Sequence, residues 1–261
     1  MSNRAALAQL AHRLRAASGF QPVAPVQGEL GGIEDAYVIQ SINRRQWIDG
    51  GRVMSGYKVA FTTEESQQIF GTSEPVYGTL FEDMRFDSGD TVPADRLARP
   101  KVEGEIVLEL ARDLPPESLS AEEIRGAVGA FYPALEIPDG CIAGKINALD
   151  MAADNAAAGG YVLGARQLLG ADTDLAAIEM TMAHNGEVVS SGTGAGCMGD
   201  PLNVLAWLQG ALARAGEPMR AGQIVFCGSL VPIIPAQSGD AFEATVPELP
   251  PVGCRFAAPA G

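Results

Sequence analysis

Histidine is almost missing from this chain, which has only His12 and His184 among its 261 residues. A zinc site built on histidines needs several of them, and a Ser-His-Asp triad needs one beside a nucleophile. His12 falls in a helical pattern outside its apolar stripe, and His184 directly precedes an Asn185-Gly186 turn, so we expect both to be surface residues. Histidine-based hydrolysis and zinc catalysis are therefore poor candidates.

Closely spaced cysteines and long apolar runs are absent as well. The four cysteines lie far apart, at positions 141, 197, 227 and 254, which excludes a redox dithiol motif and favours buried, reduced thiols. Residues 1–17 mix apolar and basic side chains, unlike a signal peptide, and no stretch reaches the roughly 18 apolar residues of a membrane span. We therefore expect a cytoplasmic protein that does not associate with a membrane.

Positive charge is scarce. The 18 Lys and Arg residues face 32 Asp and Glu residues, for a net charge of −14, so phosphate backbones and anionic lipids would repel the molecule. We therefore expect that the protein does not bind nucleic acid. Hydrophobic residues make up 47% of the chain, which is typical of a globular protein with a substantial core.

The order of sequence patterns predicts an α+β fold. Two helical patterns come first, separated by a loop rich in Gly and Pro. The first has a possible cap at Asn3 and an apolar stripe of Leu7, Leu10, Ala11 and Leu14, and the second consists of Ile33, Tyr37, Ile42 and Trp47 and is closed by Gly50-Gly51. From Arg52 onward, short β-like runs alternate with turns, and three further helices have start signals at Ser120, Asn147 and Asp200. We predict an N-terminal helical cap region over residues 1–75 and a catalytic β-rich domain over residues 76–261.

Two β-like runs carry acidic residues that could bind a metal ion. Over residues 101–110 the apolar side chains alternate, which puts Glu103 and Glu105 together on the opposite strand face. Residues 130–135 are mostly apolar and end at Glu136, a costly place for an unpartnered charge. A solvated strand face explains the first pair equally well, but three converging carboxylates would suit Mg²⁺ or Mn²⁺.

Lys58 lies inside a further strand pattern, residues 52–61. It is either a surface lysine with a buried stem, or a residue that binds a substrate carboxylate or relays a proton. Residues 194–199 spell G-x-G-x-x-G, but they follow a hairpin arm, and Asp200 would place a negative charge where a pyrophosphate should bind. We therefore interpret these glycines as a tight turn.

Several segments occur together in an order that resembles a known family. They are Gly56-Tyr57-Lys58-Val59, Glu74-Pro75-Val76-Tyr77-Gly78-Thr79-Leu80-Phe81, Val102-Glu103-Gly104-Glu105-Ile106, Pro133-Ala134-Leu135-Glu136, Ala153-Asp154-Asn155 and Ser190-Ser191-Gly192-Thr193-Gly194. The set is similar to the 2-hydroxypenta-2,4-dienoate (2-keto-4-pentenoate) hydratase and 4-oxalocrotonate decarboxylase group of the fumarylacetoacetate hydrolase superfamily. The resemblance implies a mixed β-roll or barrel-like domain with an N-terminal helical cap, assembled as a homo-oligomer.

The resemblance also implies site residues. A divalent ion, Mg²⁺ or Mn²⁺, would bind Glu103, Glu105 and Glu136, and Lys58 would be catalytic. The implied substrate-binding positions are Val76, Tyr77, Asp154 and Ala157. Two of them depart from the group, since Val76 stands where hydratases carry an aspartate and Ala157 stands where a serine is usual.

The activity implied by the resemblance is that of a metal-dependent lyase of aromatic catabolism, which hydrates a short unsaturated 2-oxo acid. The Val76-Tyr77 pair is closer to the decarboxylase version, so a 4-oxalocrotonate-type decarboxylase is an alternative. An acylpyruvate C–C hydrolase is another, and a non-catalytic protein that binds small acids or serves as a partner subunit is the alternative from a different class.

Overall fold

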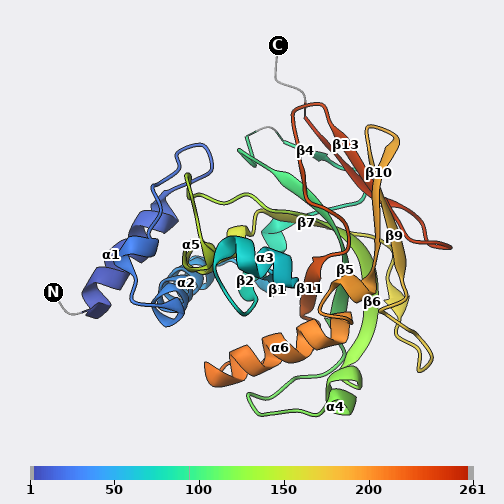
Figure 1. The fold of residues 1–261 in the computed structure, drawn as a ribbon, viewed down its shortest axis with the longest axis horizontal. Helices are drawn as coiled ribbons and strands as arrows, with labels where there is room; N and C mark the ends of the chain where they lie inside the picture. Colours follow the sequence, from blue (N-terminus) through green and yellow to red (C-terminus); the bar gives the residue numbers. More distant parts are fainter. Residues whose placement is uncertain (1–2, 94, 258–261) are drawn as a thin grey trace.

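A large curled β-sheet occupies the centre of the molecule (Figure 1). The computed structural model describes residues 3–93 and 95–257. In them, the sheet runs in the order β2-β1-β11-β5-β6-β7-β3, with β12 pairing with β5 and β8 with β6. Its strands are β1 (Met54–Ala60), β2 (Val76–Phe81), β3 (Arg85–Phe86), β5 (Lys101–Leu110), β6 (Val128–Ile137), β7 (Gly160–Leu163), β8 (Gln167–Leu168), β11 (Ile224–Ser229) and β12 (Ile234–Pro235).

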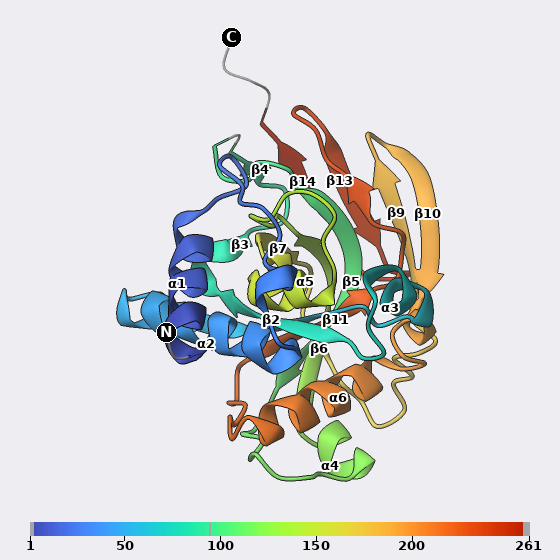
Figure 2. The same cartoon turned by 60° about the vertical axis from the view of Figure 1, so that its left-hand side comes forward.

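A second sheet packs against the long strands β5 and β6. Its strand order is β10-β9-β13-β14-β4 (Figure 2). Its strands are β4 (Thr91–Val92), β9 (Glu179–His184), β10 (Glu187–Thr193), β13 (Ala241–Thr245) and β14 (Val252–Phe256). The predicted Asn185-Gly186 hairpin joins β9 to β10, and both turn residues have positive φ, 53° and 86°. That backbone is what a two-residue hairpin turn requires.

The N-terminal helices form a separate layer against the sheet (Figure 2). Helix α1 (Asn3–Ala16) packs on α2 (Ile33–Asp49), and α2 packs on α5 (Ala148–Ala153). The apolar stripe predicted for the first helix, Leu7, Leu10, Ala11 and Leu14, is buried in this layer. The α+β prediction with helices at the N-terminus is thus confirmed. No helix in the described residues is both long and apolar enough to cross a membrane.

The helix start signals in the sequence correspond to real helix starts. Ser120 forms a capping box with Glu123 at α4 (Ala121–Arg125), Asn147 caps α5, and Asp200 accepts a hydrogen bond from the Leu202 amide at α6 (Pro201–Arg214). Helix α3 (Glu64–Phe70) was not predicted, because its seven residues are mostly polar and have no apolar period. Short 3₁₀ turns are η1 (Gln27–Glu29), η2 (Glu82–Met84), η3 (Asn155–Ala157) and η4 (Gly194–Gly196).

Strand β1 falls inside the range predicted for the helical cap, residues 1–75. It nevertheless pairs with both β2 and β11 in the large sheet, so residues 54–60 are part of the β-rich body. A domain boundary at residue 75 stays a prediction.

The large sheet buries both of its faces. On one face, Ile106 and Leu108 join a core that includes residues of α6 and the second sheet. Val107 lies on the other face in a smaller core, beside Phe226 of β11. Phe226 is also the register partner of Lys58 on β1. Because side chains alternate along a strand, Glu103, Glu105 and Lys58 all belong to this second face.

Candidate active site

Strand register brings three carboxylates together on the second face of the large sheet. In the antiparallel β5/β6 pair, Glu103 lies directly opposite Glu136, and Glu105 follows two residues later on the same side. One carboxylate oxygen of each residue lies within 4.8 Å of the others. Glu105 and Glu136 are only 0% and 1% exposed, so their charges are not solvated by bulk water.

Lys58 lies against this cluster. Its Nζ is 3.0 Å from Glu136 Oε1, and it donates a hydrogen bond of 3.0 Å to the carbonyl oxygen of Ala156. The side chain is 2% exposed, so the alternative of a surface lysine with a buried stem is wrong. When all four groups are ionised, three carboxylates and one ammonium leave two negative charges in a buried space, which is unfavourable without a further cation or bound protons.

The pKa values of these groups reflect the excess negative charge. Burial raises the pKa of Glu103 to about 7, and the charge of Glu136 adds to the effect. Burial also raises the pKa of Glu105 well above its usual range, helped by the two neighbouring carboxylates. For Lys58, burial acts to lower the pKa, but the three carboxylates, Glu136 foremost, outweigh it and hold the pKa above its ordinary value.

The donor set fits a divalent cation. Glu105 Oε1 and Glu136 Oε2 are buried and accept no hydrogen bond from the described residues, although buried polar atoms normally find a partner; Glu136 Oε1 has the ion pair with Lys58. Three carboxylate oxygens and two uncompensated charges match the preference of hard ions such as Mg²⁺ and Mn²⁺ for oxygen ligands. The structure therefore offers a place where one such ion would neutralise the cluster.

Sequence reasoning missed two backbone groups of the site. The amide of Gly228 donates to Glu105 Oε2 at 2.8 Å from a bulge in β11, and Gly228 has φ 90°. The glycine within the strand pattern was the one available hint of a bulge. The other group is the Ala156 carbonyl, and the residue type at position 156 says nothing about it.

Of the predicted substrate-binding residues, Val76 lies on the same side of the sheet as Lys58. Strand β2 pairs with β1 so that Gly78 is opposite Lys58 and Val76 is opposite Ala60. Val76 is 1% exposed and belongs to the apolar cluster of the N-terminal helices, together with Phe61. Val76 thus has apolar surroundings and lies on the strand next to that of Lys58.

Tyr77 points the other way. It lies opposite Val59, its ring stacks on Tyr37 with centroids 4.5 Å apart, and it meets Trp207 of α6 edge-on. Burial raises the pKa of Tyr77 to about 12. The structure does not bring the Tyr77 side chain to the carboxylate cluster, because alternate residues of a strand face opposite sides of the sheet.

Asp154 and Ala157 flank the turn that contains Ala156. The Asp154 carboxylate accepts hydrogen bonds from the amides of Cys141, at 2.7 Å, and Ile142, at 3.2 Å, and from the Cys141 thiol, at 2.9 Å. Burial raises its pKa to about 6, against the effect of these hydrogen bonds. Asp154 therefore anchors a loop, whereas Ala157 directly follows the carbonyl that contacts Lys58.

Comparison with known proteins agrees with this geometry. A family model described as fumarylacetoacetate (FAA) hydrolase C-terminal matches residues 60–257. A 2-keto-4-pentenoate hydratase of Paraburkholderia xenovorans (strain LB400) is 41% identical over 229 residues, which cover 87% of this chain and 85% of the relative. The 2-keto-4-pentenoate hydratase 2 of Dechloromonas aromatica (strain RCB) is 39% identical over 240 residues, with 91% and 92% covered.

Among solved structures, the 4-oxalocrotonate decarboxylase from Pseudomonas putida G7, complexed with magnesium and adipate, superposes with a TM-score of 0.92. It is 27% identical, and 98% of each chain is covered. The family resemblance inferred from the ordered segments and the predicted barrel-like sheet are both confirmed. This chain belongs to the fumarylacetoacetate hydrolase family.

Proposed function

We propose that this protein is a divalent-metal-dependent hydro-lyase that adds water to a short unsaturated 2-oxo acid or to its 2-hydroxydienoate form. The observation that carries the proposal is the buried cluster of three carboxylates with Lys58 against it. The relatives named 2-keto-4-pentenoate hydratase, at 36–41% identity, support the same activity.

In this proposal Glu103, Glu105 and Glu136 hold the cation, Mg²⁺ or Mn²⁺, and do not act as bases. A divalent ion bound there supplies Lewis-acid polarisation of the substrate's 2-oxo oxygen. The burial of Glu105 and Glu136 excludes bulk water, which strengthens the electrostatic interactions that the site makes with a substrate. The remaining positions of such an ion would be available to water or to oxygen atoms of the substrate.

Lys58 holds and moves protons in this scheme. An ammonium has three donors and no acceptor, and two of these donors face Glu136 and the Ala156 carbonyl. No third acceptor is found for the ammonium among the residues that the structure describes, so the third donor can serve a substrate carboxylate or a reacting carbon. Because its pKa is raised, Lys58 is protonated at neutral pH, so it anchors the substrate or acts as the acid that gives up a proton.

Replacement of Lys58 by Gln should lower kcat by about 100-fold or more, because a positioned general acid typically contributes about 10²–10⁴-fold. The measurement is the decay of the ultraviolet absorbance of 2-hydroxypenta-2,4-dienoate in Mg²⁺. Lys101→Gln is the matched control, because Lys101 lies exposed at the start of β5, and it should keep the wild-type rate within about twofold. A wild-type rate in Lys58→Gln would contradict the role.

Decarboxylation of a 4-oxalocrotonate-type substrate is the second candidate. It is favoured by Val76, which stands where the hydratases of the group carry an aspartate, and by the likeness to the decarboxylase structure. An assay of CO₂ release from 4-oxalocrotonate distinguishes the two activities, since only decarboxylation releases CO₂.

Val76→Asp tests whether position 76 limits water addition. We expect the ratio of hydration to decarboxylation to rise about tenfold, because a carboxylate at this place can accept the proton of the attacking water. The melting temperature should fall, since the site is apolar and buried. Val76→Asn has a similar burial penalty without a base and serves as the control. If Val76→Asp shows no gain in hydration over Val76→Asn, position 76 does not limit the reaction.

The remaining alternatives predict different results in the same assays. An acylpyruvate C–C hydrolase would release pyruvate from an acylpyruvate, and a non-catalytic protein would be stabilised by oxalate or pyruvate without turnover of any 2-oxo acid.

We further propose that the protein forms a homo-oligomer, which light scattering coupled to gel filtration would test. A cytoplasmic location is supported by Cys141, Cys197, Cys227 and Cys254, which are all free and buried.

A further inference from the structure

The turn η3 has an unusual backbone next to Lys58. Asn155, Ala156 and Ala157 have φ values of 52°, 51° and 56°, so three consecutive residues other than glycine lie in the left-handed region. This region is unfavourable for alanine, whereas asparagine adopts it more readily. Strained backbone of this kind persists where surrounding contacts hold it, and it occurs often at functional sites.

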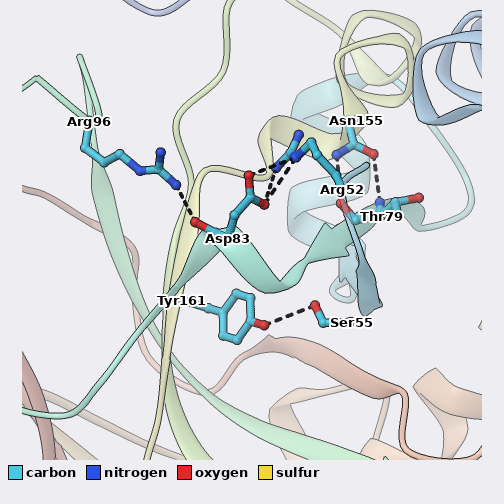
Figure 3. A network of polar contacts seen from close by, with 7 residues as sticks. All are labelled: Arg52, Ser55, Thr79, Asp83, Arg96, Asn155 and Tyr161. Atoms are coloured by element: carbon cyan, nitrogen blue, oxygen red, sulfur yellow. Dashed lines mark hydrogen bonds and ion pairs between the residues drawn. The ribbon is translucent and has the colours of Figure 1, made fainter. Parts of the chain in front are cut away.

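Backbone hydrogen bonds hold part of this turn, such as that from the Asp139 amide to the Ala157 carbonyl at 2.8 Å, and the side chain that ties the turn to β2 is that of Asn155. Its Oδ1 accepts from the Thr79 amide at 2.7 Å, and its Nδ2 donates to the Thr79 carbonyl at 2.8 Å (Figure 3). Thr79 lies on β2, the outermost strand of the large sheet, where outward backbone groups have no neighbouring strand. The side-chain amide of Asn155 thus makes the two backbone hydrogen bonds to Thr79 that a neighbouring strand would otherwise make.

The turn also lies in direct contact with β2. A Cβ atom added to Gly78 would be 2.2 Å from the Asn155 carbonyl oxygen, so only glycine allows this approach. Gly78 is the register partner of Lys58 on β1. The turn, the edge strand and the lysine are therefore packed side by side.

This arrangement places the Ala156 carbonyl in the candidate site. The left-handed turn directs the Ala156 carbonyl at Lys58 Nζ, at 3.0 Å, while Glu136 Oε1 lies 3.0 Å from the same nitrogen. The ammonium is therefore fixed between a neutral carbonyl and a carboxylate. Without the carbonyl, the lysine would keep only its attraction to the carboxylates, with Glu136 the nearest of them.

We propose that Asn155 is a positioning residue: its side-chain bridge to Thr79 holds the left-handed turn that presents the Ala156 carbonyl to Lys58 and so fixes the direction of the lysine ammonium. The inference rests on the proposed function, in which Lys58 carries a proton or holds the substrate. Asn155 itself contacts neither the carboxylates nor the lysine in the described contacts.

Asn155→Gly is the test variant, because glycine tolerates positive φ and the change removes the bridge without adding strain or charge. Gln40→Ala is the matched control. Gln40 is another buried amide that bridges to β2, donating to the carbonyls of Tyr77 at 2.8 Å and Ala152 at 2.9 Å. Both substitutions should lower the melting temperature by similar amounts.

We expect kcat of Asn155→Gly to fall by about 10–100-fold with KM within about threefold, as for other residues that orient a catalytic group. Gln40→Ala should keep the wild-type kcat. In a crystal structure of Asn155→Gly, the distance from Lys58 Nζ to the carbonyl of residue 156 should exceed 3.5 Å, beyond hydrogen-bonding range.

Wild-type kcat in Asn155→Gly, an equal loss in Gln40→Ala, or an unchanged lysine–carbonyl contact in the crystal would each overturn the inference. If wild-type protein turns over neither dienoate nor 4-oxalocrotonate, the proposed function fails, and the crystallographic distance still decides the positioning. Should Asn155→Gly not fold, Asn155→Asp replaces it, because it keeps the size, the tolerance of positive φ and the acceptor for the Thr79 amide but loses the donor to the Thr79 carbonyl. It should show the same loss of kcat and the same longer lysine–carbonyl distance, and wild-type values of both would overturn the inference.

Discussion

Glu105→Gln should reduce metal-dependent turnover by about 10³-fold and at the same time make the metal-free protein more stable. The loss in rate follows because a carboxylate ligand is replaced by a neutral amide, and Lewis-acid stabilisation of several kcal/mol corresponds to a factor of about 10³ in rate. The gain in stability follows because Glu105 is fully buried beside Glu103 and Glu136 and has a raised pKa, so folding must either bury its charge or take up a proton, and a neutral amide needs neither. The amide oxygen can still accept from Gly228.

Two measurements separate these effects. Titration calorimetry with Mn²⁺ or Mg²⁺ should show weaker binding in Glu105→Gln, and thermal unfolding in chelator should show a melting temperature a few degrees above that of the wild type. Glu109→Gln is the control, since Glu109 lies on the same face of β5 but pairs with Arg166 at 2.6 Å near the protein surface. Equal activity of wild type and Glu105→Gln, and full activity in chelator, would refute the metal site.

The stability of the metal-free protein should fall as the pH rises from about 5 to about 8. Burial raises the pKa of Glu103 from 4.5 to about 7, so between these values the folded protein binds more protons than the unfolded chain. Stability decreases with pH wherever the native state holds the extra protons. A shift of this size corresponds to the order of 3 kcal/mol, or roughly 5–10 °C in melting temperature for a chain of this length.

Two other buried groups, Asp154 and Lys58, also affect how the stability depends on pH. The pKa of Asp154, raised by burial to about 6, adds a loss of stability as the pH rises through 6. Lys58, whose pKa is raised above its ordinary 10.5, contributes stability that is lost only at pH above that value. The pH dependence near neutrality therefore comes from the buried acids.

Saturating Mg²⁺ should reverse the slope. Cation binding needs deprotonated carboxylates, so the stabilisation by the ion grows as the pH rises through 7. The measurement is thermal unfolding between pH 5 and pH 8 in chelator and in Mg²⁺, with Glu103→Gln as the variant that should flatten both curves. A melting temperature that rises with pH in chelator would contradict the assigned shift.

Local sequence signals determined most of the secondary structure. Capping residues such as Ser120 and Asp200 fixed helix starts, because they satisfy backbone amides within a few residues. The Asn185-Gly186 pair fixed a hairpin for the same local reason. Alternation along residues 101–110 was sufficient to place Glu103 and Glu105 on one face.

The resemblance named residues that these local patterns left open. It implied Glu136 as a third ligand and Lys58 as a catalytic residue, and both lie at the cluster. It also implied a substrate contact for Tyr77, whose side chain lies on the other face of β2 among aromatic rings. A motif gives positions along the chain, whereas the face of a strand depends on its register with the neighbouring strands.

By itself, the sequence determined the helix starts, the strand alternation and the excess of acidic over basic residues, since each depends on neighbours close in the chain. Only the tertiary structure decided that Glu136 lies opposite Glu103, that Lys58 lies 3.0 Å from Glu136, and that a backbone carbonyl 98 residues away meets the same lysine. These contacts join distant segments through sheet register and backbone direction, which depend on how the whole chain packs and not on the residue types at those positions.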